Sequence, residues 1–133
     1  MTDSADETAI RKLIEEWAAA VRREDLEGIL RDHAPDIVMF DVPPPFESRG
    51  IEAYEATWEL FFRCARRPVV FDINRMEILA GNEVAFAVAL MHCTSKQPDG
   101  TDVDLDFRLT VGLGKVNGRW TVVHEHHSVP AES

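Results

Sequence analysis

Three histidines are the side chains of this sequence best suited to proton transfer near neutral pH. His124 and His126 lie in the stretch from Gly118 to Pro130, which reads as a β-strand because Asn117-Gly118 opens it, β-branched and aromatic residues fill it, and a proline ends it. Side chains alternate between the two faces of a strand, so both imidazoles share one face. His92 lies in a second expected strand, and its face depends on how the two strands pair.

Three helices are expected to come first in the chain. Ser4 and Glu7 have capping-box spacing, and an apolar stripe from Ile10 to Val21 follows them. Asp25 is the expected cap of a short second helix that stops before Pro35. The third helix opens at Gly50 and is closed by Arg66-Arg67-Pro68.

The period of the apolar residues changes from helical to alternating after the third helix. Strands are predicted at about 69–80, 83–95, 102–115 and 119–128, with turn residues between them. A short earlier strand, from Asp36 to Asp41, runs into Pro43-Pro44-Pro45 and ends there. Helices followed by a meander of strands predict an α+β fold, with the helices on one face of an antiparallel sheet.

The turns allow the register of the strands to be predicted. A two-residue loop at Asn117-Gly118 sets Val111 opposite His124, and a similar loop at Pro98-Asp99 sets Leu105 opposite His92. One face then collects the large apolar residues and must lie against the helices, which places His92, His124 and His126 inside. The opposite face, predicted to be outside, holds the residues Ala85, Ala87, Ala89, Met91, Asp104, Asp106, Arg108, Thr110, Glu125 and His127. Two interpretations stay open for the inward histidines, a satisfied polar network and a binding or catalytic site.

Composition narrows the class of protein. The chain has 133 residues, 45% of them hydrophobic, and a net charge of −10, which fits one globular domain and argues against nucleic acid or an anionic membrane as a partner. Two cysteines without metal-site spacing, and an acidic N-terminus without an apolar run, predict a cytoplasmic protein with reduced thiols.

The order of these elements resembles the SnoaL-like proteins of the ketosteroid isomerase and nuclear transport factor superfamily. The resemblance rests on Asp41 before the proline loop, the Arg49-Gly50 helix start, and the closing Trp120-x-Val-x-His-x-His-x-Ser-x-Pro strand. It implies a single domain over residues 1–133, with a cone-shaped fold in which a curved, mostly antiparallel sheet wraps three helices. It also implies a pocket between sheet and helices, and a homodimer through the outer sheet face.

The same resemblance implies roles for individual residues. Asp41 matches the position of the isomerase's base, but Trp17 and Leu105 stand where its two oxyanion donors would be, which argues against steroid isomerisation by that machinery. The SnoaL-like cyclases use a carboxylate and no metal. In a scheme of that kind, Asp41 takes a proton next to a carbonyl and His126 or His92 donates a hydrogen bond to the enolate. The predicted substrate-binding residues are Trp17, Phe40, Tyr54, Trp58, His92, Phe107 and His124.

Two classes of function follow from this reading. The first is a small-molecule pocket protein. As an enzyme it would be an isomerase, cyclase or hydratase that uses an Asp base next to a carbonyl of a hydrophobic substrate. The second is a non-catalytic ligand-binding or homo-oligomerisation domain, similar to the association domain of calcium/calmodulin-dependent kinases, which also closes on a His-x-His-x-Ser strand. Neither a metal nor a cofactor is expected, because Glu125 is predicted to point away from the His-x-His pair.

Overall fold

The helices form where local capping signals predict them. The computed structural model describes residues 4–97 and 99–131, with helices α1 (Ala5–Arg22), α2 (Leu26–Leu30) and α3 (Ile51–Cys64). The Ser4 hydroxyl accepts a hydrogen bond from the Glu7 amide at 3.1 Å, and the Asp25 carboxylate caps α2 through the Gly28 amide, also at 3.1 Å. No helix within the described residues is long and apolar enough to cross a membrane.

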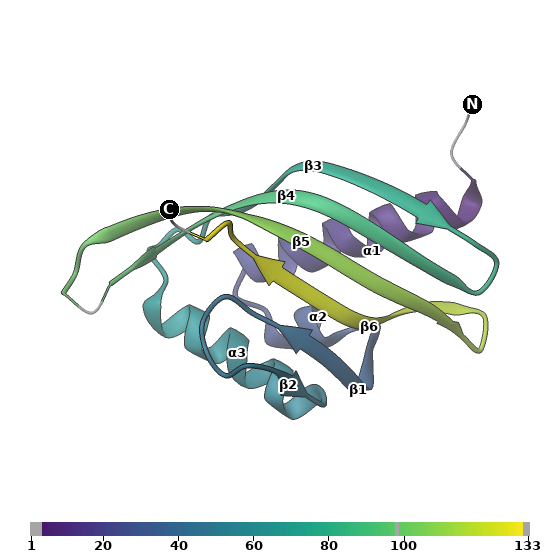
Figure 1. The fold of residues 1–133 in the computed structure, drawn as a ribbon, viewed down its shortest axis with the longest axis horizontal. Coiled ribbons are helices and arrows are strands. Elements are labelled where there is room, and N and C mark those ends of the chain that lie inside the picture. The colour runs from purple at the N-terminus through teal and green to yellow at the C-terminus, as the bar shows by residue number, and fades with distance from the viewer. Residues whose placement is uncertain (1–3, 98, 132–133) are drawn as a thin grey trace.

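Six strands form one curved sheet, and the helices lie behind it (Figure 1). The strands are β1 (His33–Phe40), β2 (Ser48–Arg49), β3 (Phe71–Ala80), β4 (Val84–Lys96), β5 (Asp102–Val116) and β6 (Arg119–Ser128). Their order is β2-β1-β6-β5-β4-β3, and all neighbours are antiparallel except β1 and β6, which run parallel. The predicted α+β class and the mostly antiparallel sheet are therefore confirmed.

A β-bulge in β6 sets the face on which each of its later side chains lies. Leu113 pairs with Val122, but the next residue of β5, Gly112, pairs with His124, so Val123 is the extra residue. Trp120 and Val122 point inward before the bulge, whereas Glu125 and His127 point inward after it.

The register of the β4–β5 hairpin also differs from the prediction by one residue. The Gln97 amide donates to the Thr101 carbonyl at 2.8 Å, and Gly100 has a φ of 86°, so the strands close one position later than a two-residue loop would allow. Met91 consequently pairs with Phe107. A slip of one residue exchanges the two faces of a strand.

The prediction that His92, His124 and His126 lie inside was therefore wrong. His126 is exposed, His92 and His124 are half-buried, and all three lie on the outer face, while Glu125 and His127 are buried. On β4, the small residues Ala87 and Ala89 face the core and the larger Phe86, Val88 and Leu90 face outward. Both faces of β4 are apolar, so hydrophobicity alone could not fix its register. The predicted inward face of β5 was right, since Phe107, Leu109 and Val111 are buried.

Candidate acid–base site

The buried carboxylate of Glu125 is the centre of a polar cluster inside the apolar core. Its residue is 1% exposed, and the bulge of β6 turns it toward the helices. Four other side chains join it from four elements: His33 at the start of β1, Tyr54 on α3, Trp17 on α1 and His127 on β6. We call these five residues the Glu125 cluster.

Hydrogen bonds satisfy both oxygens of the Glu125 carboxylate. Oε2 accepts from the Tyr54 hydroxyl at 2.7 Å and lies 2.9 Å from Nε2 of His33. Oε1 lies 3.0 Å from Nε2 of His127. The Tyr54 hydroxyl in turn accepts from the Trp17 indole N–H at 2.9 Å. A buried charge is tolerated when it is paired and hydrogen-bonded in this way.

Both ring nitrogens of His33 have hydrogen-bond partners. Its Nδ1 lies 2.8 Å from the Arg31 carbonyl and its Nε2 lies 2.9 Å from the Glu125 carboxylate. The Tyr54 hydroxyl also lies 3.1 Å from the same Nε2, so this nitrogen faces a carboxylate oxygen and a hydroxyl together. When His33 carries a proton on both nitrogens, this contact is a buried ion pair, because the His33 and Glu125 side chains are 1% and 2% exposed.

Opposing effects act on the acid groups of the cluster. Burial by itself raises the pKa of Glu125, but the hydrogen bonds from His127 and His33 outweigh it and lower that pKa from 4.5 to about 2. Burial and the adjacent Glu125 charge raise the pKa of Tyr54 well above 10.0, so its hydroxyl stays protonated. At neutral pH the cluster therefore holds a carboxylate next to a phenol donor.

Aromatic rings surround the His127 end of the cluster. The Phe107 ring stacks on the His127 imidazole at a centroid distance of 5.5 Å, and Trp17 and Trp58 each lie 6.4 Å from it. Phe71 packs against both tryptophans at 5.3 and 5.5 Å. Four of the predicted substrate-binding residues are thus brought together here: Trp17, Tyr54, Trp58 and Phe107.

Two polar atoms in this interior have no hydrogen-bond partner among the residues described. They are Nε1 of Trp58 and Oγ1 of Thr94, and both residues are buried, at 3% and 5% exposure. The Trp58 N–H lowers the pKa of the neighbouring Tyr54, against the larger effect of burial, but does not reach hydrogen-bonding geometry. Leaving a buried donor unpaired costs about 1–3 kcal/mol.

Asp41 lies apart from the Glu125 cluster, directly after β1. It is half-buried, and its Oδ1 accepts a hydrogen bond from the Val42 amide at 2.8 Å, as a turn residue does. Together with burial, which is the larger cause, its charge raises the pKa of the Cys93 thiol to about 11. Cys93 therefore remains a thiol and is a poor nucleophile at neutral pH.

The remaining predicted site residues lie on the outer face of the sheet, in two places. Phe40 contacts the rings of His124 and His126 at centroid distances of 5.0 and 5.3 Å. His92 is separate from them: its Nδ1 lies 2.7 Å from Asp106, which together with Asp104 raises the pKa of its imidazole. The Asp41 charge acts on Cys93, which is buried, whereas His126 is exposed on the outer face of the sheet.

Sequence reasoning missed Glu125, His127 and His33. The first two were placed outside because the bulge was not foreseen. The third was left out because the first strand was expected to begin at Asp36 and begins at His33. A signal for the bulge was present, since glycines inside a strand mark bulges and close approaches: a Cβ on Gly112 would meet the His124 Cβ at 3.4 Å.

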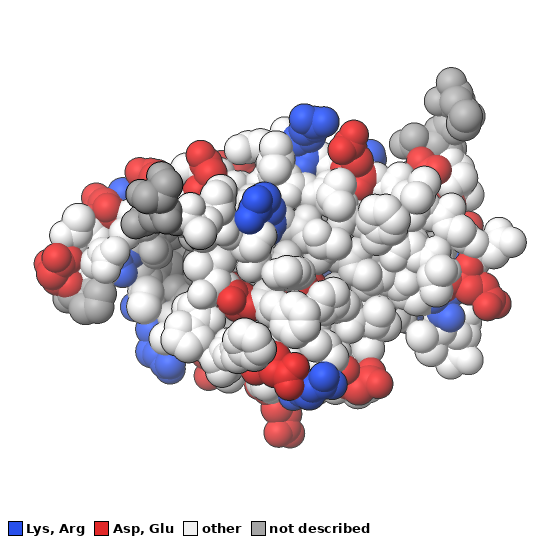
Figure 2. Space-filling model, viewed as in Figure 1, with Lys and Arg blue, Asp and Glu red and all other residues white. Residues whose placement is uncertain are grey.

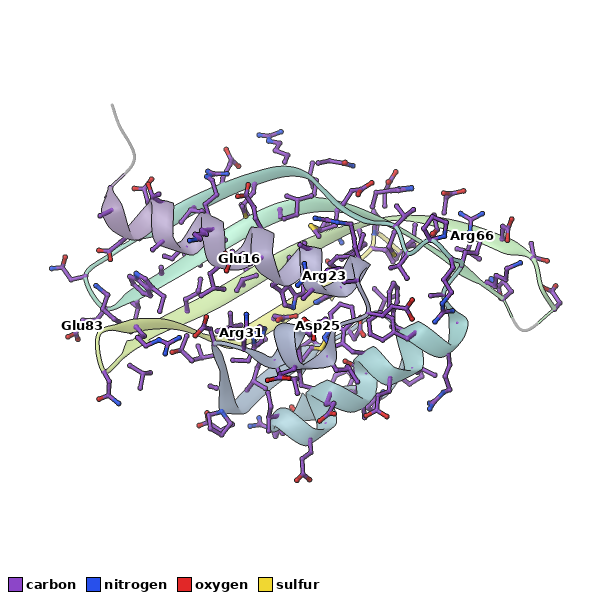
Figure 3. All side chains as sticks on the ribbon, turned by 180° about the vertical axis from the view of Figure 1, so that it is seen from behind. Glu16, Arg23, Asp25, Arg31, Arg66 and Glu83 are labelled. Atoms are coloured by element: carbon purple, nitrogen blue, oxygen red, sulfur yellow. The ribbon has the colours of Figure 1, made fainter. Side chains whose placement is uncertain are left out.

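A surface hollow of about 270 Å³ lies between α1 and α2, next to the cluster. Trp17 forms part of its wall, and so does Arg31, whose carbonyl holds His33. Seen from the helix side, Glu16, Arg23 and Arg31 lie near one another around this region (Figure 3). A second and larger hollow, of about 670 Å³, lies between α1 and β3 and is lined by Arg11, Arg22 and Asp72, among others.

The lowered pKa of Glu125 makes a prediction about stability and pH. The carboxylate contributes fully to stability above pH 4.5, and this contribution of about 3 kcal/mol is lost as the pH falls toward 2. Glu125→Gln removes the buried carboxylate that pairs with His33 and His127, so the variant should be less stable at pH 7 by about 3–5 kcal/mol. Urea unfolding at pH 7, 4.5 and 3 should show the difference between wild type and variant shrinking with acidity. Parallel curves would contradict the assigned ion pair.

Comparisons with known proteins agree with this architecture. The model of the SnoaL-like domain matches residues 10–132. A nuclear transport factor 2-like protein of unknown function from Pseudomonas putida KT2440 is 35% identical, with a TM-score of 0.85 over 99% of this chain and 92% of its own. The comparison with curated proteins finds no match.

Two further solved structures share the fold at lower identity. A ketosteroid isomerase-like protein from Erwinia carotovora atroseptica is 15% identical, with a TM-score of 0.79 over 95% of this chain and 97% of its own. A protein from Xanthomonas campestris named as a calcium/calmodulin-dependent protein kinase II association domain is 22% identical, with a TM-score of 0.78 over 99% and 91%. On the match to the domain model and the 35% identity, this chain belongs to the SnoaL-like domain family.

Proposed function

We propose that this protein binds a hydrophobic molecule that carries a carbonyl, and that it moves a proton on the carbon next to that carbonyl. The observation that carries the proposal is the Glu125 cluster, an ionised carboxylate hydrogen-bonded to two imidazoles and a phenol inside an aromatic core. Replacing a buried ion pair by apolar residues is often neutral or stabilising. Because burying these charged and polar groups costs free energy, the cluster is a better candidate for chemistry than for a role in stability alone.

The surroundings of the cluster fit the proposed substrate class. Trp17, Trp58 and Phe107 are buried around the cluster and make its surroundings apolar, which suits the hydrophobic part of a ligand. The cluster places the imidazole of His127 next to a fixed carboxylate, and a histidine beside a carboxylate is a suitable pair for proton transfer. The fold is compatible with ligand binding or isomerase-type chemistry, and its known members differ in function, so the argument rests on these side chains.

Exchange of deuterium into β-tetralone, a hydrophobic ketone, tests this proposal directly. The wild type in D₂O should speed exchange of the protons next to the carbonyl, followed by ¹H NMR. Glu125→Gln should reduce the enzymatic rate by about 100-fold or more, because general acid–base catalysis contributes factors of this size.

Asp106→Asn is the matched control for that experiment. It removes another carboxylate that is paired with a histidine, but an exposed one on the outer face. Its exchange rate should equal that of the wild type. A wild-type rate no faster than buffer would contradict the proposed chemistry.

A specific observation also favours the second class of function, homo-oligomerisation through the outer face of the sheet. Val84, Phe86, Val88 and Leu90 form an apolar row on β4 and are 70%, 45%, 37% and 47% exposed. Figure 2 shows this side of the molecule, where the surface over the middle strands is largely uncharged and most charged side chains lie toward the edges. An apolar row of this kind supports a homodimer in which two such faces pack together. The dimer and the interior site are compatible.

Leu90→Asp tests the dimer. A carboxylate buried without a partner opposes association, so the variant should elute as a monomer while the wild type elutes as a dimer, measured by light scattering after gel filtration. Leu60→Asp on α3 is the control, because Leu60 is comparably exposed, at 41%, and lies on a helix outside the sheet face. A monomeric wild type, or a Leu90→Asp variant that remains dimeric, would contradict the interface.

A further inference from the structure

The hollow of about 670 Å³ lies between α1 and β3, the last strand of the sheet. Ligand pockets in proteins commonly have volumes of about 300–1,000 Å³. From α1 it is lined by Arg11, Glu15 and Arg22, whose spacing of four and seven residues puts them on one stripe of the helix. From β3 it is lined by residues 72–76. The hollow is separate from the Glu125 cluster, because none of its lining residues belongs to that cluster.

Three arginines line this hollow, and two of them lack an acidic partner. Arg11 and Arg22 make no ion pair with any carboxylate in residues 4–97 and 99–131. Arg22 Nη1 instead donates to the Phe71 carbonyl at 2.8 Å, which holds its guanidinium beside β3. The third, Arg75, lies 3.7 Å from Glu77 in a contact that is 67% exposed on both sides and therefore weak. Because the chain has 24 acidic and 14 basic residues, carboxylates are plentiful, and weakly paired arginines gathered in one hollow indicate an anionic ligand.

A β-bulge in β3 brings two polar side chains to the hollow. Ile73 pairs with Met91 and Arg75 pairs with Leu90, so Asn74 is the extra residue. Without the bulge, Arg75 would share the inward face of Ile73. The extra residue turns Arg75 away from the core and adds the exposed amide of Asn74 to the lining. Bulges at sheet edges and next to functional sites commonly redirect side chains in this way.

The other lining residues limit what the hollow can bind. Glu15 and Asp72 also line it, and neither makes an ion pair with a described basic residue. Three arginines against two carboxylates leave a charge of +1, in a chain whose net charge is −10. Ile73 and Met76 are half-buried and supply apolar surface. A molecule with one anionic group and an apolar part fits this lining better than a polyanion does.

The direction of the two elements shows which arginines act together. α1 and β3 run in opposite directions along the hollow (Figure 1). Arg22 is held beside Phe71, and Arg11 lies about 16 Å before it on a helix that rises 1.5 Å per residue. A strand covers that distance in about five residues, which brings Arg11 level with Arg75 and Met76. Arg11 and Arg75 therefore approach one end of the hollow from facing walls.

We propose that this end of the hollow binds the anionic group of a small organic molecule, a phosphate or a carboxylate, between Arg11 and Arg75. The side-chain amide of Asn74 supplies a further donor, and the apolar part of the molecule lies against Ile73 and Met76. Guanidinium groups bind both kinds of anion through paired hydrogen bonds. Glu15 lies one helical turn from Arg11 and opposes the anion. The site uses no residue of the Glu125 cluster, so it goes beyond the proposed function and can be tested apart from it.

Titration of the ¹⁵N-labelled protein with phenyl phosphate and with benzoate, followed by ¹H–¹⁵N NMR at pH 7 and low salt, tests this site. Either anion should shift the amides of residues 72–76 and of the Arg11 turn, and the comparison shows whether phosphate or carboxylate is preferred. Benzyl alcohol, which has the ring without the charge, should not shift them. Arg11→Gln and Arg75→Gln should each weaken binding of the preferred anion about tenfold. Their melting temperatures should match that of the wild type, because neither arginine has a strong partner.

Two further variants separate a specific site from general attraction to positive charge. Arg63→Gln removes an exposed arginine of α3 that does not line the hollow, and it should bind the anion as the wild type does. Glu15→Gln should bind it about threefold more tightly, because a like charge is removed. The site would be overturned if neither anion shifted the amides of the hollow, if benzyl alcohol shifted them equally, or if Arg63→Gln weakened binding as much as Arg11→Gln.

Discussion

This structure depends on one constraint, the presence of an ionised carboxylate, that of Glu125, in an apolar core. Moving a carboxylate from water into the interior costs several kcal/mol unless partners replace the lost hydration. Glu125 is 1% exposed, and its partners are two imidazoles and a phenol. The positions of those partners are thus requirements of one buried charge, and the indole of Trp17 extends the same chain of bonds to α1.

This requirement ties together elements that hydrophobic packing would hold only loosely. His33 binds the start of β1 to β6, and Tyr54 binds α3 to the same strand. Apolar packing tolerates small shifts of one layer over another, whereas hydrogen bonds of 2.7 to 3.0 Å fix both distance and direction. The aromatic rings around His127 then have a defined frame, which a site for proton transfer needs.

Local signals predicted the helices and strands well. Which face of β4 and of β6 lies against the helices, however, depends on the register with the strands they pair with. Ser4 and Asp25 do cap helices, and β6 spans the predicted residues 119–128. The bulge at Val123, however, depends on the pairing with the opposite strand, where Gly112 lies across from His124. One extra residue then exchanged the predicted inner histidines, His124 and His126, for Glu125 and His127. The family resemblance predicted the fold and the aromatic residues of the interior, whereas the buried carboxylate of Glu125 could be found only from the structure.

In β4 the face that lies outside is the one that was predicted to lie inside, and this changes the outer surface of the sheet. The residues that face outward are Phe86, Val88 and Leu90, so the exposed side of the sheet is more apolar than the alanine-rich face that the sequence suggested. Interior and exterior of this sheet are therefore linked: the same register that buries small side chains under the helices leaves large ones available for association.

The large sequence separation between Glu125 and its partners affects the order in which the core forms during synthesis. His33 and Tyr54 are separated from Glu125 by 92 and 71 residues, and β6 follows all the other strands in the chain. During synthesis, β1 and all three helices leave the ribosome well before the carboxylate that binds His33 has been translated. The charged core is then completed in a late step, when β6 pairs with β1 and brings Glu125 to His33 and Tyr54.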